Sequence, residues 1–248
     1  MEPMPDPPDP SAAPSLQPIS RPLSDILTET AVVLLVCVVP EVFTSIALPL
    51  LPKGGADPFI YQYLSRTLHS ISIIGLVLYI IYRSGESYSQ FGLKPLKPRI
   101  DLAGGIGVFF LGMLGYYAVW IILASVLGQK TTATLANQDL SSFASPTGRG
   151  SYLLLAVASI ANGFAEELVV RSYLIPRFER IFSSTPLALL LSTGVFASYH
   201  TYQGTGGVIS VAAIGLVYGW IFCRFRRLWP LAIGHGTQDL ISLLFWLK

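Results

Sequence analysis

The feature that most constrains this fold is a series of long apolar runs. A helix needs about 20 apolar residues to cross a bilayer, and residues 100–127 contain a single charged side chain, Asp101. Only 12% of the 248 residues are charged, and the mean hydropathy is +0.59, whereas soluble domains are about one quarter charged. The sequence therefore predicts an all-α fold, a polytopic transmembrane helical bundle.

We predict about seven spans, with a range of six to eight because the first and third are long enough to be broken. They lie at residues 26–51, 59–82, 100–127, 151–181, 187–200, 208–225 and 229–247. Pro40 predicts a kink in the first span, and Glu41 beside it either lines a polar cavity or pairs with another helix. Small residues at 204–207 predict a glycine-rich turn before the sixth span.

The tail and the loop charges predict how the chain is organised. Residues 1–25 are rich in Pro, Asp and Ser and predict a disordered tail, so that residues 26–248 form one membrane-embedded domain. With seven spans, ten basic residues fall on the side of the N-terminus and four on the other, which places the N-terminus in the cytoplasm. The ten are Arg21, Arg83, Lys94, Lys97, Arg99, Arg177, Arg180, Arg224, Arg226 and Arg227; the four are Lys53, Lys130, Arg149 and Lys248. A net charge of +2 is too small to indicate nucleic acid as a partner.

Two adjacent carboxylates, Glu166 and Glu167, end an apolar run in the fourth span. A charged side chain in hydrocarbon costs about 2.5–3.5 kcal/mol on insertion scales. Glu167 and Arg171 are four residues apart, so they share a helix face and can pair. Glu166 points about 100° away and lacks that partner. Either Glu166 is available for chemistry, or the whole group is a buried ion-pair cluster that holds helices together.

Two later spans add further ionisable groups at comparable depth. The fourth and fifth spans form a hairpin near Ser184, with Glu166 18 residues before it and His200 16 residues after it. At 1.5 Å per residue the two heights differ by only about 3 Å, so Glu166 and His200 can face one another. His235 and Asp239 are four apart and share a face of the last span.

These residue types can hydrolyse a peptide bond in two ways. A carboxylate beside an imidazole can activate water as a general base, and His235 then suits a donor aimed at a developing oxyanion. Alternatively, Glu166, His200 and His235 could hold a catalytic zinc ion. The chain has no His-Glu-x-x-His motif and the three groups come from separate helices. We therefore favour water activation with no metal and no other cofactor.

The motifs Glu-Glu-x-x-x-Arg at 166–171, Phe-x-x-x-His at 196–200 and His-x-x-x-Asp at 235–239 occur in this order on successive spans. In this the chain resembles the CPBP family, the CAAX proteases and bacteriocin-processing proteins, also called the ABI family. These are similar to type II CAAX prenyl endopeptidases. The resemblance covers a catalytic core at about residues 151–247.

The resemblance implies a glutamic-type intramembrane endopeptidase that cuts near the cytoplasmic face. Glu166 with His200 would activate water, and His235 with Asp239 would form the oxyanion site. Glu167, Arg171 and Phe196 would support them structurally. Eukaryotic CAAX enzymes typically have Asn at the position of Asp239. An ionised aspartate donates no hydrogen bond, so Asp239 is protonated, orients His235, or binds something else.

The resemblance also implies a protein or peptide substrate, with or without a lipid, and a bacterial inner membrane as the location. Three other functions remain open: a non-enzymatic bacteriocin self-immunity or membrane scaffold protein, a zinc-dependent version of the same peptidase, and a proton-coupled transporter. The last is disfavoured because the sequence shows no inverted repeat.

Overall fold

The computed structural model describes residues 21–47, 59–136, 145–146 and 149–246. This part of the chain is helical and contains no strand, which confirms the predicted all-α class. Five of its helical segments are long and apolar enough to cross a membrane, and a shorter apolar helix, α8 (Thr185–Ser198), follows the fourth. The five are Leu23–Ile46, Phe59–Ser84, Pro98–Leu127, Gly150–Phe182 and Thr201–Phe225.

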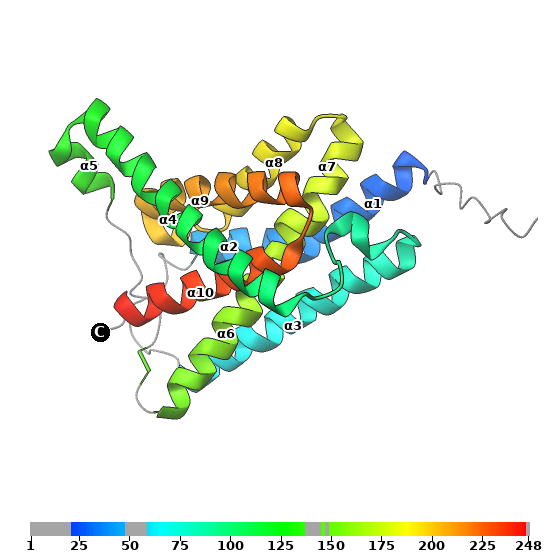
Figure 1. Cartoon of the computed structure of the whole chain (residues 1–248), viewed down its shortest axis with the longest axis horizontal. Coiled ribbons are helices and arrows are strands. Elements are labelled where there is room, and N and C mark those ends of the chain that lie inside the picture. The colour runs from blue at the N-terminus through cyan, green and yellow to red at the C-terminus, as the bar shows by residue number, and fades with distance from the viewer. Residues whose placement is uncertain (1–20, 48–58, 137–144, 147–148, 247–248) are drawn as a thin grey trace, which may run out of the picture.

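The elements follow the predicted runs closely (Figure 1). In chain order they are α1 (Leu23–Val33), a π-helical segment (Leu34–Val38), α2 (Val39–Ala47), α3 (Phe59–Ser84), a 3₁₀ turn (Tyr88–Phe91), α4 (Pro98–Leu127), α5 (Gln129–Leu135), α6 (Arg149–Glu167), a second π-helical segment (Leu168–Leu174), α7 (Ile175–Phe182), α8, a 3₁₀ turn (Thr201–Gln203), α9 (Gly204–Phe225) and α10 (Leu228–Trp246). The last predicted span is α10, whose polar centre at 235–239 keeps it out of the five long apolar segments.

Three boundaries differ from the prediction. The first helix begins at Leu23, inside the predicted tail, whose residues 1–20 lie outside the described residues. A short helix, α5, occupies the start of the predicted loop after the third span. The predicted turn at 204–207 is wrong, because these residues form the first turn of α9. A Cβ atom at Gly206 would collide with the Leu135 carbonyl, so this glycine permits close packing against α5.

A continuous helix from Arg149 to Phe182 runs through the centre of the bundle and carries the paired glutamates. Its wide π-helical turns at Leu168–Leu174 end just before Pro176, which has no amide proton to donate to the preceding turn. Such insertions are frequent at functional sites. This one places Arg171 in the buried interior of the bundle.

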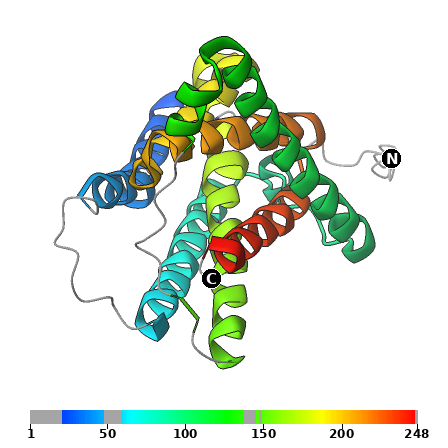
Figure 2. The same ribbon diagram turned by 90° about the vertical axis from the view of Figure 1, so that its left-hand side faces the viewer.

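Glycines set how closely the helices around this centre approach. Helix α10 crosses α6 where a Cβ atom at Gly163 would overlap the backbone of Gly236 (Figure 2). Helix α4 packs on α10 through Gly105, which faces Ile233. Gly107, on the same helix, faces open space and takes no part in this contact. Helix α3 covers another side of α6.

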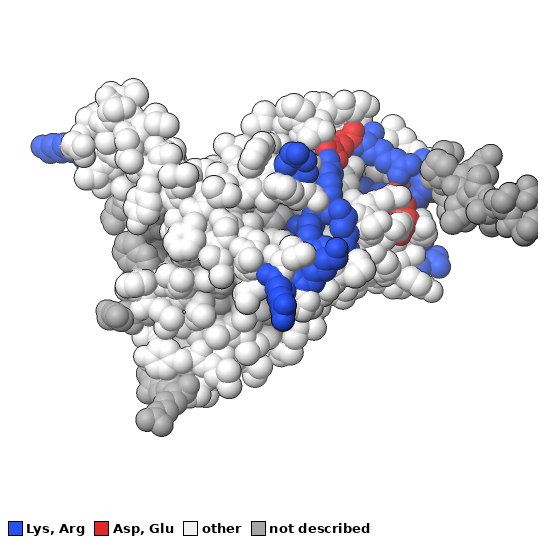
Figure 3. Space-filling model, viewed as in Figure 1, with Lys and Arg blue, Asp and Glu red and all other residues white. Residues whose placement is uncertain are grey.

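Most of the basic side chains visible in Figure 3 gather in the centre and on the right of this face, and one lies at the opposite end. Glu86, just after α3, pairs with Arg177 at 2.6 Å, with Arg180 at 2.7 Å and with Arg21 at 3.2 Å. Arg21 also pairs with Glu29 at 2.6 Å. We call these five residues the arginine–glutamate cluster. It ties the start of α1 and the end of α3 to α7.

Candidate active site

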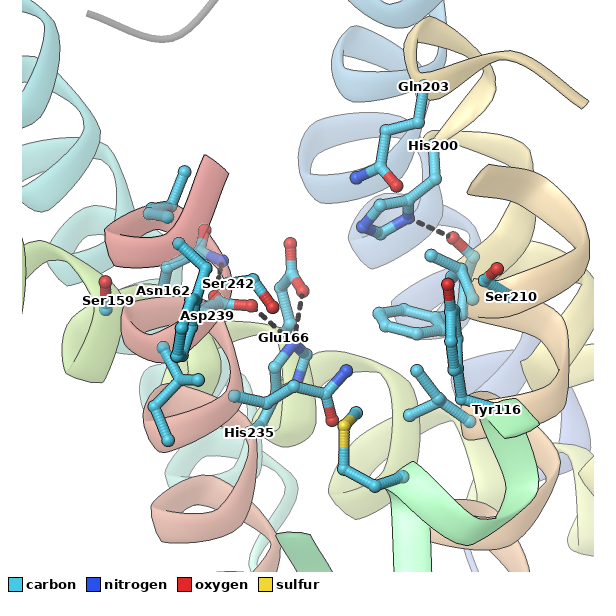
Figure 4. A pocket seen from close by; sticks show the side chains of 18 of the residues that line it. Tyr116, Ser159, Asn162, Glu166, His200, Gln203, Ser210, His235, Asp239 and Ser242 are labelled. Atoms are coloured by element: carbon cyan, nitrogen blue, oxygen red, sulfur yellow. Dashed lines mark hydrogen bonds and ion pairs between the residues drawn. The ribbon is translucent and has the colours of Figure 1, made fainter. Parts of the chain in front are cut away.

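Three separate parts of the chain line one cavity of about 420 Å³ (Figure 4). Glu166 comes from the C-terminal end of α6, His200 from the turn after α8, and His235 and Asp239 from α10. The three motifs singled out in the sequence therefore meet in one place. The roles assigned to their residues remain predictions.

Glu167 is the buried centre of a small network beneath this cavity. Its Oε1 accepts a hydrogen bond of 2.7 Å from Arg171, four residues on, which is the pair predicted from the spacing. The same oxygen lies 2.7 Å from Nδ1 of His235. Because a carboxylate only accepts hydrogen bonds, Nδ1 carries the proton. Glu167 therefore fixes the tautomer and orientation of His235.

The other ring nitrogen of His235 faces two carboxylates. Its Nε2 lies 3.3 Å from Oε2 of Glu166 and 3.5 Å from Oδ1 of Asp239. Asp239 also accepts a hydrogen bond of 3.0 Å from the side-chain amide of Asn162, one helical turn before Glu166. Of the three conceivable roles for Asp239, orienting His235 is the one that these contacts favour.

His200 lies across the cavity from Glu166 (Figure 4). Its Nδ1 is 2.8 Å from the carbonyl oxygen of Phe196, which can only accept a hydrogen bond, so Nδ1 is protonated. In the neutral ring Nε2 is then an acceptor. The prediction that Glu166 and His200 face one another holds to the extent that both line this cavity, but the imidazole within ion-pair distance of Glu166 is that of His235.

Phe196 connects the two sides of the site. The Arg171 guanidinium carbon lies 4.0 Å from the centre of its ring, a cation–π contact. The same ring packs edge-on against His200 at 4.8 Å and against His235 at 5.7 Å between centroids. Phe196 is buried, and these contacts fit the supporting place predicted for it.

Two residues that the sequence analysis did not select also belong to the cavity wall. Asn162 lies four residues before Glu166, and this spacing was a usable signal for a shared helix face. Arg66, the eighth residue of α3, lines the cavity as well. Only the packing of α3 on α6 could show this.

The zinc alternative can be tested against the ligand geometry. Across the described residues, no three His, Cys, Asp or Glu side chains converge tightly enough to hold a metal ion. Glu166, His200 and His235 line a common cavity but do not form such a set. These residues as arranged do not fit zinc, and no step below passes through a metal.

Comparison with known proteins agrees with this arrangement. Residues 148–241 match the family described as type II CAAX prenyl endopeptidase Rce1-like. This segment of the chain is similar to the Rce1-like family. The Rce1-like segment contains Glu166, His200, His235 and Asp239. No curated protein and no solved structure matches the chain. Its five long apolar helices indicate an integral membrane protein, and residues 148–241 are similar to a family of proteases.

Proposed function

We propose that this protein is a glutamic-type intramembrane endopeptidase, in which Glu166 is the general base. The observation that carries the proposal is the position of Glu166. It lies in a cavity between two histidines, while its neighbour Glu167 is taken up by Arg171 and His235. One carboxylate of the pair is thus held structurally and the other faces the space where a substrate can lie.

In the proposed reaction a water molecule sits in the cavity between Glu166 and Nε2 of His200. The Glu166 carboxylate takes a proton from this water as its oxygen bonds to the scissile carbonyl carbon. The proton then passes from Glu166 to the leaving nitrogen as the C–N bond breaks. The products are a carboxylic acid and an amine, and Glu166 returns to its starting state.

His235 supports the anionic intermediate in this proposal. With Nδ1 bonded to Glu167, a proton on Nε2 gives a cation that faces Glu166 and the cavity. Such a preorganised donor is most effective in a site of low dielectric constant. Asp239, held by Asn162, keeps the ring oriented and balances its charge.

We also propose a class of substrate and an orientation of the protein in the membrane. The cavity that Glu166 lines has apolar as well as polar walls, including Met113, Tyr116, Ile214 and Leu243. Such walls suit a protein or peptide segment with or without a lipid. The arginine–glutamate cluster would lie at the cytoplasmic face. We propose a bacterial inner membrane with the N-terminus in the cytoplasm.

The test compares new peptide termini in membranes from cells that make the wild-type protein or Glu166→Gln. The substitution keeps the shape of the side chain and removes the base. We expect termini made by the wild type to disappear in Glu166→Gln, with unchanged insertion and melting temperature. Glu179→Gln is the matched control, because Glu179 pairs with Arg226 at 2.5 Å outside the cavity. Substantial cleavage by purified Glu166→Gln would remove the assignment. A wild type that cuts nothing would favour a scaffold or immunity function.

Metal content separates the two chemistries. We expect purified active protein to contain no stoichiometric zinc and to keep its activity after dialysis against a chelator. Zinc that tracks activity mole for mole would overturn the glutamic-type mechanism and leave the peptidase assignment standing.

A further inference from the structure

A second cavity of about 330 Å³ reaches Glu166 from its other side. Its walls come from the first π-helical segment and α2, from α3, from α6 and the second π-helical segment, and from Tyr199 after α8. Arg66, Asn162 and Glu166 line both cavities, so they form the partition between them. Glu166 can therefore be approached from two directions.

The second cavity contains an ion pair that the proposed reaction does not use. Nε2 of His69 lies 2.8 Å from Oε1 of Glu41, which joins α3 to α2. The two side chains are 49% and 40% exposed, far more than any member of the site around His235. Both expectations for Glu41 in the sequence analysis are thus met: it pairs with another helix and lines a polar cavity.

The depth of this pair in the membrane is what makes it informative. His69 is ten residues from the start of α3 and fifteen from its end, about 15 Å and about 22 Å along the helix axis. A half-exposed ion pair at that depth would face hydrocarbon at a substantial cost in free energy. The cost disappears when the surrounding space holds water. Gln62, Ser65 and Ser70 give the same cavity further polar walls.

Hydrolysis of a bound substrate requires a route by which water reaches Glu166. Each bond cleaved consumes one water molecule, and the larger cavity must hold the substrate segment while that water arrives. A substrate pressed against the apolar walls of the larger cavity would block water on that side. The second cavity reaches the same carboxylate and shares only Arg66, Asn162 and Glu166 with the walls of the larger cavity.

We propose that the second cavity is a water-filled path that delivers the hydrolytic water to Glu166, kept hydrated by the Glu41–His69 pair. Its use in catalysis rests on the proposed function, whereas its hydration does not. The two can therefore fail separately.

Hydration is measured by cysteine accessibility in open membrane fragments. The starting variant for these measurements carries Cys37→Ala and Cys223→Ala, because both cysteines are free thiols that the reagent could modify. Ser65→Cys places a thiol on the cavity wall, while Leu64→Cys and Leu68→Cys, on the same helix, bracket its depth and lie outside the cavity. We expect a charged, water-soluble thiosulfonate to modify Ser65→Cys at least tenfold faster than either control. Equal rates would overturn the proposal, whether or not the protein cleaves peptides.

Catalytic use is measured with two versions of the pair. Glu41→Gln with His69→Gln keeps the wall polar, and we expect kcat within about twofold of the wild type. Glu41→Met with His69→Leu makes it apolar, and we expect kcat to fall at least tenfold with KM unchanged, together with slower modification of Ser65→Cys. Leu68→Ala is the control for altered packing, and melting temperatures verify folding. If the Gln pair loses as much activity as the apolar pair, the charges and not the water are required, and the proposal is wrong.

Discussion

The arginine–glutamate cluster differs from the ionisable side chains around His235, which we call the cavity group, in how its charges are balanced. In the cluster, Glu86 receives three arginines, and Glu29 pairs with two of them. In the cavity group, the carboxylates of Glu166, Glu167 and Asp239 meet the imidazole of His235, and Glu167 also pairs with Arg171. Among the described residues, Oε2 of Glu166 accepts no hydrogen bond.

This difference separates stability from chemistry. A charge with dedicated partners stabilises the fold, and its removal exposes an unpaired buried group. A carboxylate that shares one imidazole and faces a cavity contributes less to folding and remains able to take a proton. We therefore expect substitutions in the cluster to change melting, substitutions at the cavity surface to change turnover, and the Glu167 network to lie between them.

The largest effect on turnover after loss of Glu166 is expected at His200. His200→Gln removes the basic ring nitrogen that faces the cavity and keeps a polar side chain of similar reach. General acid–base assistance contributes about 10²–10⁴-fold, so we expect kcat to fall by a factor in that range while the variant still folds and melts cooperatively. Steady-state kinetics on one cleaved peptide and a melting curve decide this. A decrease in kcat of tenfold or less would mean that Glu166 activates the water without His200.

Arg171→Ala is expected to have the largest effect on stability. It leaves Glu167 buried and takes the cation away from the Phe196 ring. Breaking a buried pair costs about 3–5 kcal/mol, so expression or the melting temperature in detergent should drop sharply. Glu167→Gln with Arg171→Met, which removes both charges, should recover part of the loss. A stable but inactive Arg171→Ala would instead mean that Arg171 contacts the substrate.

Much of this arrangement was accessible from the sequence, because it depends on periodicity and composition. Apolar length predicted the helices, and the four-residue spacing predicted the Glu167–Arg171 pair. The height estimate for the hairpin correctly placed Glu166 and His200 around the same space. That estimate compares positions along the fourth and fifth spans, and it gives no position for His235 on the last span. His235 reaches Glu166 because α10 crosses α6 at Gly163 and Gly236, and crossings of this kind leave only small residues as a signal.

Other parts could not be predicted because packing decides them. Arg66 lies where a basic side chain would usually reach the membrane interface, but α3 packs on α6 and turns it towards the cavity. The glycines at 204–207 have the composition of a turn, yet the contact of Gly206 with α5 makes them helical. In both cases a neighbouring helix, which the local sequence pattern does not show, decides the outcome.

Arg177→Met tests the expectation that substitutions in the arginine–glutamate cluster change melting and leave turnover unchanged. Arg177 is buried and pairs with Glu86 at 2.6 Å and Glu29 at 3.2 Å, and its guanidinium lies over the Phe91 ring at 4.9 Å. Methionine retains the apolar stem, so the loss is mainly that of hydrogen bonds to charged groups, about 1.5–3 kcal/mol. We expect a lower melting temperature and unchanged kcat per folded molecule. Arg83→Met, at the exposed end of α3, is the control and should change neither.

The smallest expected effect is the pH dependence of the cluster. Burial raises the pKa of Glu86, but the charge of Arg177 and the hydrogen bonds from Arg177 and Arg21 outweigh it, so that the pKa lies below the ordinary value of 4.5. A carboxyl whose pKa is lower in the folded state stabilises the fold above the unfolded-state pKa, and this contribution declines as the pH falls through the folded-state pKa. The difference in melting temperature between the wild type and Glu86→Gln should therefore be constant from pH 7 to about pH 5 and shrink below about pH 4.5. Ser89→Ala, in the same loop, should differ from the wild type by the same amount at every pH, since Ser89 bonds only to neutral groups. A difference for Glu86→Gln that is equally independent of pH would show that Glu86 acts through packing, and the contrast between a charge-balanced cluster and a reactive cavity would then rest on the arginines alone.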